Sequence, residues 1–393
     1  MTEWRKVKLG DVSCYVNDKI DIASFDNSLY ISTDSMLSDK GGITAPESIP
    51  TTGKVTKYQF EDILVSNIRP YFKKIWKSNR DGGCSNDVLV FRGNPTMILP
   101  TFLYYVLSCD SFFEHMMAGA NGTKMPRGNK KLILNYTFGL PDLAVQRRIA
   151  EVLSRYDALI ENYQRQIKLL EEAAQRLYKE WFVDLRFPGH QSTPIINNLP
   201  QSWQKKKLGE IVKTTSGGTP SRGKPEYYTG DILWVKTKEL NDSFILDTEE
   251  KISIEAINKS SAKILPSGSV LLAMYGATIG KLGIASKKMA CNQACCVFLF
   301  DDNDVFRWFL YNWLIINRSF LISQGKGAAQ PNLSQDMIKN FETIIPDTPL
   351  LEKYHRMVAP LYDRIMNNQA QIRNLSEARD RLLPKLMSAK IVF

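Results

Sequence analysis

Two stretches in the N-terminal half combine cations with aromatic and polar side chains, a mixture suited to binding nucleic acid. They are residues 66–80, SNIRPYFKKIWKSNR, and residues 122–131, GTKMPRGNKK. A surface in which Lys and Arg alternate with Tyr, Trp, Asn and Thr can bind phosphate and also contact base edges. For either stretch taken alone, a solvated loop without a ligand is the alternative.

The sequence carries no complete enzyme motif. Gly217-Gly218-Thr219-Pro220 and Gly325-Lys326-Gly327 resemble phosphate-binding loops, but neither has the GxxxxGK[ST] spacing between a strand and a helix. Glu249-Glu250-Lys251, with Asp247 nearby, loosely resembles a nuclease carboxylate-lysine pattern, of a kind that arises by chance in any charged chain. Motifs of serine hydrolases, zinc proteases, dinucleotide-binding proteins and amino-methyltransferases are missing. The residues therefore favour a binding protein over an enzyme acting alone.

Composition points to a reduced, cytoplasmic protein with an anionic partner. The net charge of +10 and the pI near 9.1 favour such a partner, because a basic surface attracts polyphosphate. The six cysteines form no CxxC pair and the three histidines are scattered, so we expect no metal site. The N-terminus has no apolar signal segment. The most apolar stretch, residues 306–322, contains Arg307 and Arg318 and reads as a buried helix.

The elements that must position these residues are organised around two long helices. In residues 153–181, large or apolar side chains recur in alternating steps of three and four, the a/d pattern of a coiled coil. The same pattern returns in residues 358–386, at a constant offset of 205 (358 − 153 = 205). Each helix follows a similar tripeptide, Leu140-Pro141-Asp142 or Ile345-Pro346-Asp347. We expect the apolar seam to comprise Leu153, Tyr156, Ile160, Ile167, Leu170, Leu177, Val358, Leu361, Ile365, Ile372, Leu375 and Leu382.

A fixed offset with matching residues indicates an internal repeat, so the chain is expected to consist of two similar halves. Short β-prone runs and a helix near residues 100–117 make each half a mixed α+β domain. We predict two globular domains separated by two long antiparallel coiled-coil helices, with internal pseudo-twofold symmetry. The predicted boundaries are 1–142 for the first domain, 143–184 for the first helix, 185–202 for a linker, 203–347 for the second domain and 348–393 for the second helix.

This order resembles the specificity (S) subunit of type I restriction-modification systems over nearly the whole chain. The resemblance rests on LAVQRRIAEVL at 143–153, on YKEWF at 178–182, and on GGTPS at 217–221 followed by Tyr227. The second helix departs from the family pattern, since residues 350–354 read LLEKY and Pro360 and Pro384 predict kinks.

The resemblance implies a non-catalytic subunit with two target-recognition domains, each reading one part of a split, asymmetric site in double-stranded DNA. Two methylase subunits carrying S-adenosylmethionine would dock on the helices, and motor-nuclease subunits would join for cleavage. A spacer of roughly 42 Å suits half-sites about one DNA turn, or 34–36 Å, apart. The alternatives are an enzyme with its own nuclease or methylase activity, a coiled-coil scaffold, and a DNA-binding protein outside restriction-modification.

Both halves offer loop residues for this role. We expect DNA contacts from Arg69, Lys73, Lys74, Lys124 and Arg127 in the first domain, and from Arg222, Lys236, Lys238, Tyr275, Thr278, Lys281 and Lys326 in the second. Lys more often holds phosphate, whereas Arg, Asn and Gln more often read bases.

Overall fold

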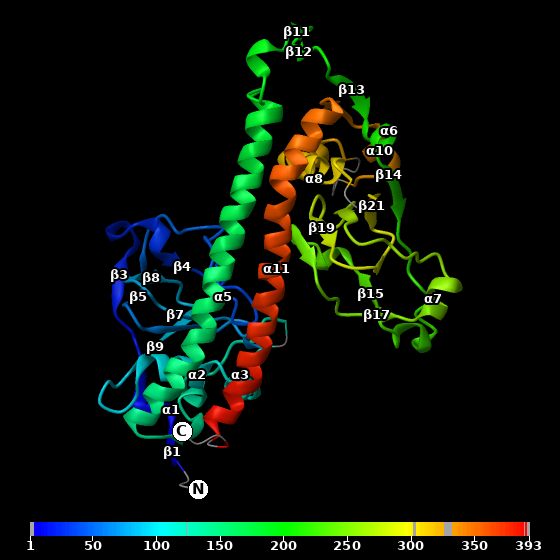
Figure 1. Ribbon diagram of the computed structural model, residues 1–393. Helices are drawn as coiled ribbons and strands as arrows, with labels where there is room; N and C mark the ends of the chain where they lie inside the picture. The colour runs from blue at the N-terminus through cyan, green and yellow to red at the C-terminus, as the bar shows by residue number, and fades with distance from the viewer. Residues whose placement is uncertain (1–3, 123, 302–303, 326–331, 389, 391–393) are drawn as a thin grey trace. The chain divides into compact units, whose positions relative to one another are not determined.

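The structure is a computed structural model that describes residues 4–122, 124–301, 304–325, 332–388 and 390. It divides into two compact units, one comprising Met1–Glu161 with Asn374–Phe393 and the other Asn162–Arg373. The two longest helices, α5 (Leu143–Tyr178) and α11 (Thr348–Met387), both cross this division (Figure 1). Each unit therefore contains one globular domain and a part of each long helix.

Both long helices begin with an aspartate whose side chain caps the first turn. The side chain of Asp142 accepts a hydrogen bond from the backbone N–H of Val145 at 2.8 Å, and Asp347 accepts one from Leu350 at 3.0 Å. These carboxylates satisfy backbone donors in the first turn that have no partner within the helix. The repeated Pro-Asp pair thus fixes where each helix starts. At its other end α5 passes into a π-helical turn, Lys179–Val183.

Within each unit the segments of α5 and α11 run antiparallel. In the second unit, Asn368 donates a hydrogen bond to Gln166 at 3.2 Å, and the rings of Tyr178 and Tyr354 lie 6.3 Å apart. Residue numbers thus rise along α5 as they fall along α11. In the first unit, Leu153 of α5 packs in one hydrophobic cluster with Leu383 and Leu386 of α11.

The residues expected on the seam all lie at least partly out of water. Leu153, Ile160, Val358 and Ile365 are buried. The others are half-buried, namely Tyr156, Ile167, Leu170, Leu177, Leu361, Ile372, Leu375 and Leu382. Several neighbouring residues on the two helices, such as Tyr178, Tyr354 and Tyr362, are buried more deeply than the half-buried seam residues. The buried face is wider than an a/d stripe because the helices also pack against the globular domains.

Among its described residues, the first unit contains three small sheets, with strand orders β1-β10, β2-β9-β6-β7 and β3-β5-β8-β4. The strands are β1 (Arg5–Lys8), β2 (Ser13–Tyr15), β3 (Lys19–Asp21), β4 (Tyr30–Ile31), β5 (Lys54–Tyr58), β6 (Ile63–Ser66), β7 (Ile75–Lys77), β8 (Gly82–Cys84), β9 (Val88–Gly93) and β10 (Thr137–Leu140). The short helices are α1 (Leu9–Val12), α2 (Pro100–Leu107), α3 (Asp110–Ala118) and α4 (Lys130–Ile133).

The second unit has a related topology, with strand orders β13-β22, β14-β21-β18-β19-β16 and β17-β15-β20 and the additional hairpin β11-β12. The order β14-β21-β18-β19 matches β2-β9-β6-β7 of the first unit, whereas β16 is an additional edge strand and the sheet β17-β15-β20 has three strands in place of four. Its strands are β11 (Ile195–Ile196), β12 (Leu199–Pro200), β13 (Gln204–Lys207), β14 (Lys213–Ser216), β15 (Ile232–Val235), β16 (Ser243–Ile245), β17 (Lys251–Ile252), β18 (Val270–Ala273), β19 (Leu282–Ala285), β20 (Ala290–Cys291), β21 (Cys295–Leu299) and β22 (Glu342–Ile345). Its helices are α6 (Leu208–Ile211), α7 (Ile254–Asn258), α8 (Phe306–Ile316), α9 (Arg318–Ser323) and α10 (Gln335–Asn340).

In detail the structure differs from the sequence-based elements at several places. The stretch 306–322, expected as one buried helix, is divided at Asn317 into α8 and α9. The helix expected near 100–117 is divided into α2 and α3, because Cys109 has an extended backbone and the hydroxyl of Ser108 bonds back to the carbonyl of Tyr104. Conversely, Pro360 and Pro384 do not end α11. Pro360 and the residue one turn before it, Arg356, are exposed, so water can bond the carbonyl that lacks a helical partner.

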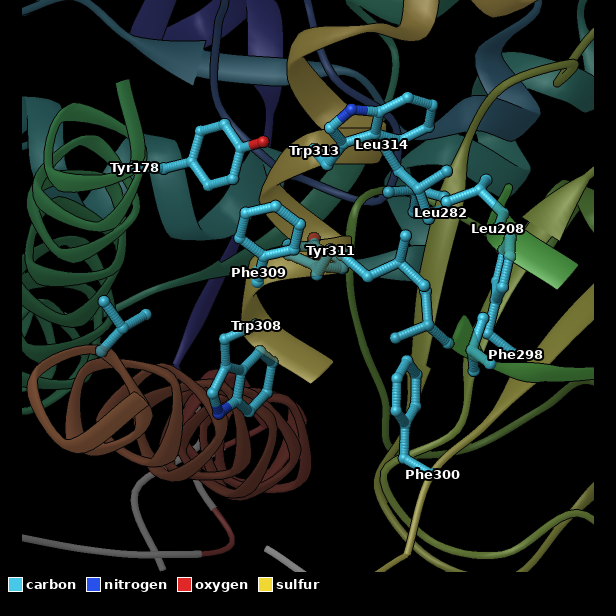
Figure 2. Packing of buried hydrophobic residues seen from close by; sticks show 14 of the residues in the cluster. Tyr178, Leu208, Leu282, Phe298, Phe300, Trp308, Phe309, Tyr311, Trp313 and Leu314 are labelled. Atoms are coloured by element: carbon cyan, nitrogen blue, oxygen red, sulfur yellow. The ribbon is translucent and has the colours of Figure 1, made fainter. Parts of the chain in front are cut away.

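Helix α8 links the sheet of the second unit to the long helices. In Figure 2 its side chains Trp308, Phe309 and Tyr311 lie in one cluster with Tyr178 of α5 and with residues of the strands. The ring of Trp308 stacks on Tyr362 of α11, with centroids 4.0 Å apart. This cluster holds the domain of the second unit on its portions of α5 and α11.

Glu171 of α5 is an acidic residue in a half-buried position of the second unit. Burial raises the pKa of Glu171 to about 7, and the negative charges of Asp242 and Glu172 add to the shift. Above pH 7 the carboxylate is charged in both the folded and the unfolded chain, and the folded state bears the cost of its desolvation.

We expect Glu171→Gln to stabilise the protein at pH 8 and to have little effect at pH 5. A carboxyl whose folded pKa is raised contributes stability below its unfolded pKa and loses it as pH rises to about 7. The gain at pH 8 should be about 1–2 kcal/mol after allowance for water access. Urea unfolding at both pH values measures this difference. Equal effects of Glu171→Gln and Glu172→Gln would contradict the assignment.

Candidate nucleic-acid interface

The loop between β6 and β7, residues 67–74, has a strained backbone. Arg69 and Lys73 have left-handed φ angles of 48° and 50°, and they flank a 3₁₀ turn, Pro70–Phe72. A left-handed φ angle at a residue other than glycine costs about 1 kcal/mol or more of stability. Strain of this kind concentrates at functional sites. The surrounding fold must therefore hold this loop in place.

Backbone bonds join the β6–β7 loop to the segment 121–128. The N–H of Arg69 donates to the carbonyl of Pro126 at 2.8 Å, and the N–H of Gly128 donates to Asn67 at 3.2 Å. A Cβ at Gly128 would stand 2.8 Å from the side-chain oxygen of Asn67, so a larger residue here would displace the Asn67 side chain. The two basic stretches recognised in the sequence thus form one surface.

Of the five cations expected in this domain, two are exposed and three are half-buried. Lys124 and Arg127 are exposed, and Arg69 is half-buried. Arg127 lies 3.3 Å from the carboxylate of Asp87, an exposed pair that costs little to open. Lys124 and Arg127 are therefore accessible to phosphate or to base edges.

The other two cations, Lys73 and Lys74, hold the loop. Lys73 pairs with Asp110 of α3 at 2.9 Å. Lys74 donates to the carbonyl of Thr33 at 2.7 Å, and burial lowers the pKa of its amine. Both act within the domain, and their expected contact with DNA stays a prediction.

The loop between β18 and β19, residues 274–281, is the counterpart in the second unit. Met274 donates its N–H to Ala294 at 2.9 Å, as Asn67 donates to Asp87 at 2.8 Å, and both bonds span 20 residues (294 − 274 = 20; 87 − 67 = 20). Here the left-handed positions are glycines, Gly276 and Gly280, with φ angles of 84° and 80°. The two loops therefore share a backbone hydrogen bond at equivalent positions and contain left-handed residues, but they carry different side chains.

The three candidates on the β18–β19 loop differ in accessibility. Tyr275 is exposed and Thr278 is half-buried. Lys281 is exposed and pairs with Asp242 at 2.9 Å, and Arg318 of α9 holds the same carboxylate. Lys326 lies outside the described residues.

The remaining candidates of the second unit form an ion-pair cluster elsewhere in the domain. Lys236 contacts Glu249 at 2.8 Å and Glu250 at 2.7 Å, Arg222 contacts Glu250 at 2.7 Å, and Lys238 pairs with Glu249. The hydrogen bonds from Lys236 and Lys238 lower the pKa of Glu249 to about 2. Three cations on two carboxylates leave one net positive charge. Glu249 and Glu250, which belong to the stretch that loosely resembles a nuclease pattern, are therefore ion-pair partners of these cations.

The sequence-based candidates omit the exposed apolar residues beside these cations. Tyr71, Phe72 and Met125 are 48%, 36% and 47% exposed. The signal that marks them is the Pro-Tyr-Phe run between Arg69 and Lys73, since a proline inside a basic, β-prone stretch predicts a turn and therefore exposure.

Nothing in the described residues suggests a metal site or a membrane span. Across 4–122, 124–301, 304–325 and 332–388, no group of three or more His, Cys, Asp or Glu residues could hold a metal ion. Cys84 and Cys296 are buried, and burial raises the pKa of each thiol to about 12. Over the same described residues, we find no helix with the length and apolar character needed to traverse a bilayer.

Known proteins share this organisation. A model of the type I restriction modification DNA specificity domain matches residues 1–172 and again residues 200–374. The chain belongs to this family. Its function is sequence-specific DNA recognition in a restriction-modification system. The two matches correspond to the two domains and to much of both long helices.

Individual relatives agree with this family. The type I restriction enzyme MjaIX specificity subunit of Methanocaldococcus jannaschii is 28% identical over 301 residues, which cover 75% of this chain and 69% of the relative. The HindI specificity subunit of Haemophilus influenzae is 24% identical and matches over the full length of both proteins. The crystal structure of the S subunit from M. genitalium has the same fold, with a TM-score of 0.58, 16% identity, and 98% and 96% of the two chains covered.

Proposed function

We propose that this specificity subunit reads an asymmetric DNA site in two parts, one with each unit. The observation that carries the proposal is the repetition of one loop plan with different side chains. Residues 67–74 present Arg69, Tyr71 and Phe72, whereas the equivalent residues 274–281 present Tyr275 and Thr278. Because base sequence is read by side chains in the grooves, different side chains on equivalent loops imply different half-sites.

The chain would act with partners in the cytoplasm. We propose that two methylase subunits, which hold S-adenosylmethionine, dock on α5 and α11, and that motor-nuclease subunits join for cleavage. Exposed charged side chains along both helices, such as those of Glu172, Arg176 and Arg364, provide polar surface for such contacts. The chain itself would bind no cofactor, and the purified chain alone should neither methylate nor cleave DNA.

Mapping of adenine methylation tests the proposal. The chain is co-expressed with a candidate methylase subunit, and methylated adenines are mapped across the host genome. The expected result is a bipartite, non-palindromic motif that disappears when this chain is omitted. A motif that persists without the chain, or methylation by the chain alone, would refute the proposal that this chain recognises the site and the methylase subunit modifies it.

Charge removal at Lys124 should weaken binding to all DNA sequences alike. Lys124 is exposed on the segment joined to the β6–β7 loop. Removing one phosphate contact should reduce the dependence of log affinity on log salt by about 0.9. We expect Lys124→Gln to show this change in titrations with the motif duplex and with unrelated DNA. Lys54→Gln, which alters an exposed lysine of β5 outside both loops, should leave the slope unchanged. An unaltered slope for Lys124→Gln would exclude a phosphate contact.

A further inference from the structure

Two aromatic rings stand exposed on the β6–β7 loop. The ring centroids of Tyr71 and Phe72 lie 4.6 Å apart, and the side chains are 48% and 36% exposed. Each ring leaves substantial apolar area in water, and this exposure is unfavourable unless a partner covers it. Lys74 covers part of the Phe72 ring, with its amine 5.8 Å from the ring centroid, but the fold leaves much of both rings in water.

The loop that carries the rings is held on three sides. The carbonyl of Phe72 accepts a hydrogen bond from Asp39 at 2.9 Å, and the carbonyl of Lys73 accepts one from Lys40 at 3.0 Å. Asp110 takes ion pairs from both Lys73 and Lys40, at 2.9 and 3.3 Å. The backbone that carries the rings is therefore held in place without a ligand, which reduces the entropy lost on binding.

The cations on residues 121–128 indicate which kind of ligand binds over the two rings. Lys124 and Arg127 are exposed on residues 121–128, which are bonded directly to the loop. Apolar rings beside accessible cations suit a DNA groove, because phosphates line its rim and its floor offers thymine methyl groups and base steps among the polar base edges. DNA is favoured as the occupant because the chain belongs to a family of DNA specificity domains.

We propose that Tyr71 and Phe72 are specificity-determining residues that contact bases of the first half-site through their rings, while the neighbouring cations hold phosphate. This rests on the proposed function, which it deepens by separating base contacts from backbone contacts. Tyr275, 37% exposed on the equivalent β18–β19 loop, takes the same role for the second half-site. Apolar side chains discriminate bases by touching thymine methyl groups or by entering a base step.

The test uses the complex of this chain with its methylase subunit and duplexes that carry the mapped motif. Affinity is measured for the intact motif, for duplexes altered in the first or second half-site, and for unrelated DNA. The double variant Tyr71→Ala, Phe72→Ala should bind the intact motif about 10- to 100-fold more weakly. It should bind unrelated DNA within about twofold of the unaltered complex and should no longer distinguish changes in the first half-site. Tyr275→Ala should lose discrimination at the second half-site only.

Phe60→Ala is the matched control, since Phe60 is 63% exposed and precedes β6 at the end opposite the loop. It should retain both discriminations. Thermal unfolding of the double variant should match that of the unaltered chain, because neither ring is part of the core. Retained discrimination at the first half-site, or an equal loss on every duplex, would overturn the assignment of base contacts. If the unaltered complex itself shows no preference for the motif, the proposed function fails, and this inference fails with it.

Discussion

Replacing Tyr354 by alanine is expected to lower the free energy of unfolding of the second unit by about 3–5 kcal/mol. Tyr354 is fully buried on α11, and its ring lies 4.9 Å from Phe182 and 5.9 Å from Trp181. Its hydroxyl accepts a hydrogen bond from the buried amide of Asn312 at 3.1 Å. The substitution therefore leaves a large cavity and removes a hydrogen bond in the same place.

Tryptophan fluorescence during urea unfolding measures this loss. Of the seven tryptophans, Trp181, Trp203, Trp234, Trp308 and Trp313 belong to the second unit, so the signal reports mainly on that unit. Tyr354→Phe is the matched control and should cost about 1 kcal/mol, because it keeps the ring and removes only the hydroxyl. A similar, small loss for both variants would show that the ring packing contributes little.

Replacing Arg379 by alanine is expected to destabilise the first unit by about 2–3 kcal/mol. Arg379 of α11 is 14% exposed and contacts Asp157 of α5 at 2.7 Å, and the hydroxyl of Tyr105 from α2 donates to the same carboxylate at 2.6 Å. Without Arg379, a partly buried negative charge keeps the hydrogen bond from Tyr105 but loses its cation. The 30% exposure of the Asp157 side chain lets water offset part of the cost.

Hydrogen exchange of the amides in α2 and in the first half of α5 locates the effect, and urea unfolding gives its size. Arg381→Ala serves as the control, since Arg381 is 82% exposed and should change stability by less than about 0.5 kcal/mol. The pair Arg379→Met with Asp157→Asn should recover most of the loss, because it removes both charges together. Equal losses for Arg379→Ala and Arg381→Ala would contradict a structural role for the Arg379–Asp157 pair.

Much of the architecture is predictable from local sequence patterns. The heptad pattern predicts the helices observed as α5 and α11, and the constant offset predicts two similar units, which share the strand order β2-β9-β6-β7 or β14-β21-β18-β19 but differ in their other sheet. The runs at 63–66 and 88–91 are found as β6 and within β9. Local patterns failed where a single side chain decided the outcome. The division between α2 and α3, for example, depends on one serine hydroxyl and one extended residue.

The candidate interface shows the same division between local and non-local information. Residue type and spacing are local properties, and they are enough to predict basic, turn-rich loops at equivalent places in both halves. Which of the cations are accessible depends on the folded structure. Lys74 bonds to Thr33 and Lys236 bonds to Glu249 and Glu250, whereas Lys124 remains exposed on a segment joined to the β6–β7 loop. Ion pairs and burial join residues far apart in the chain, and packing alone brings them together.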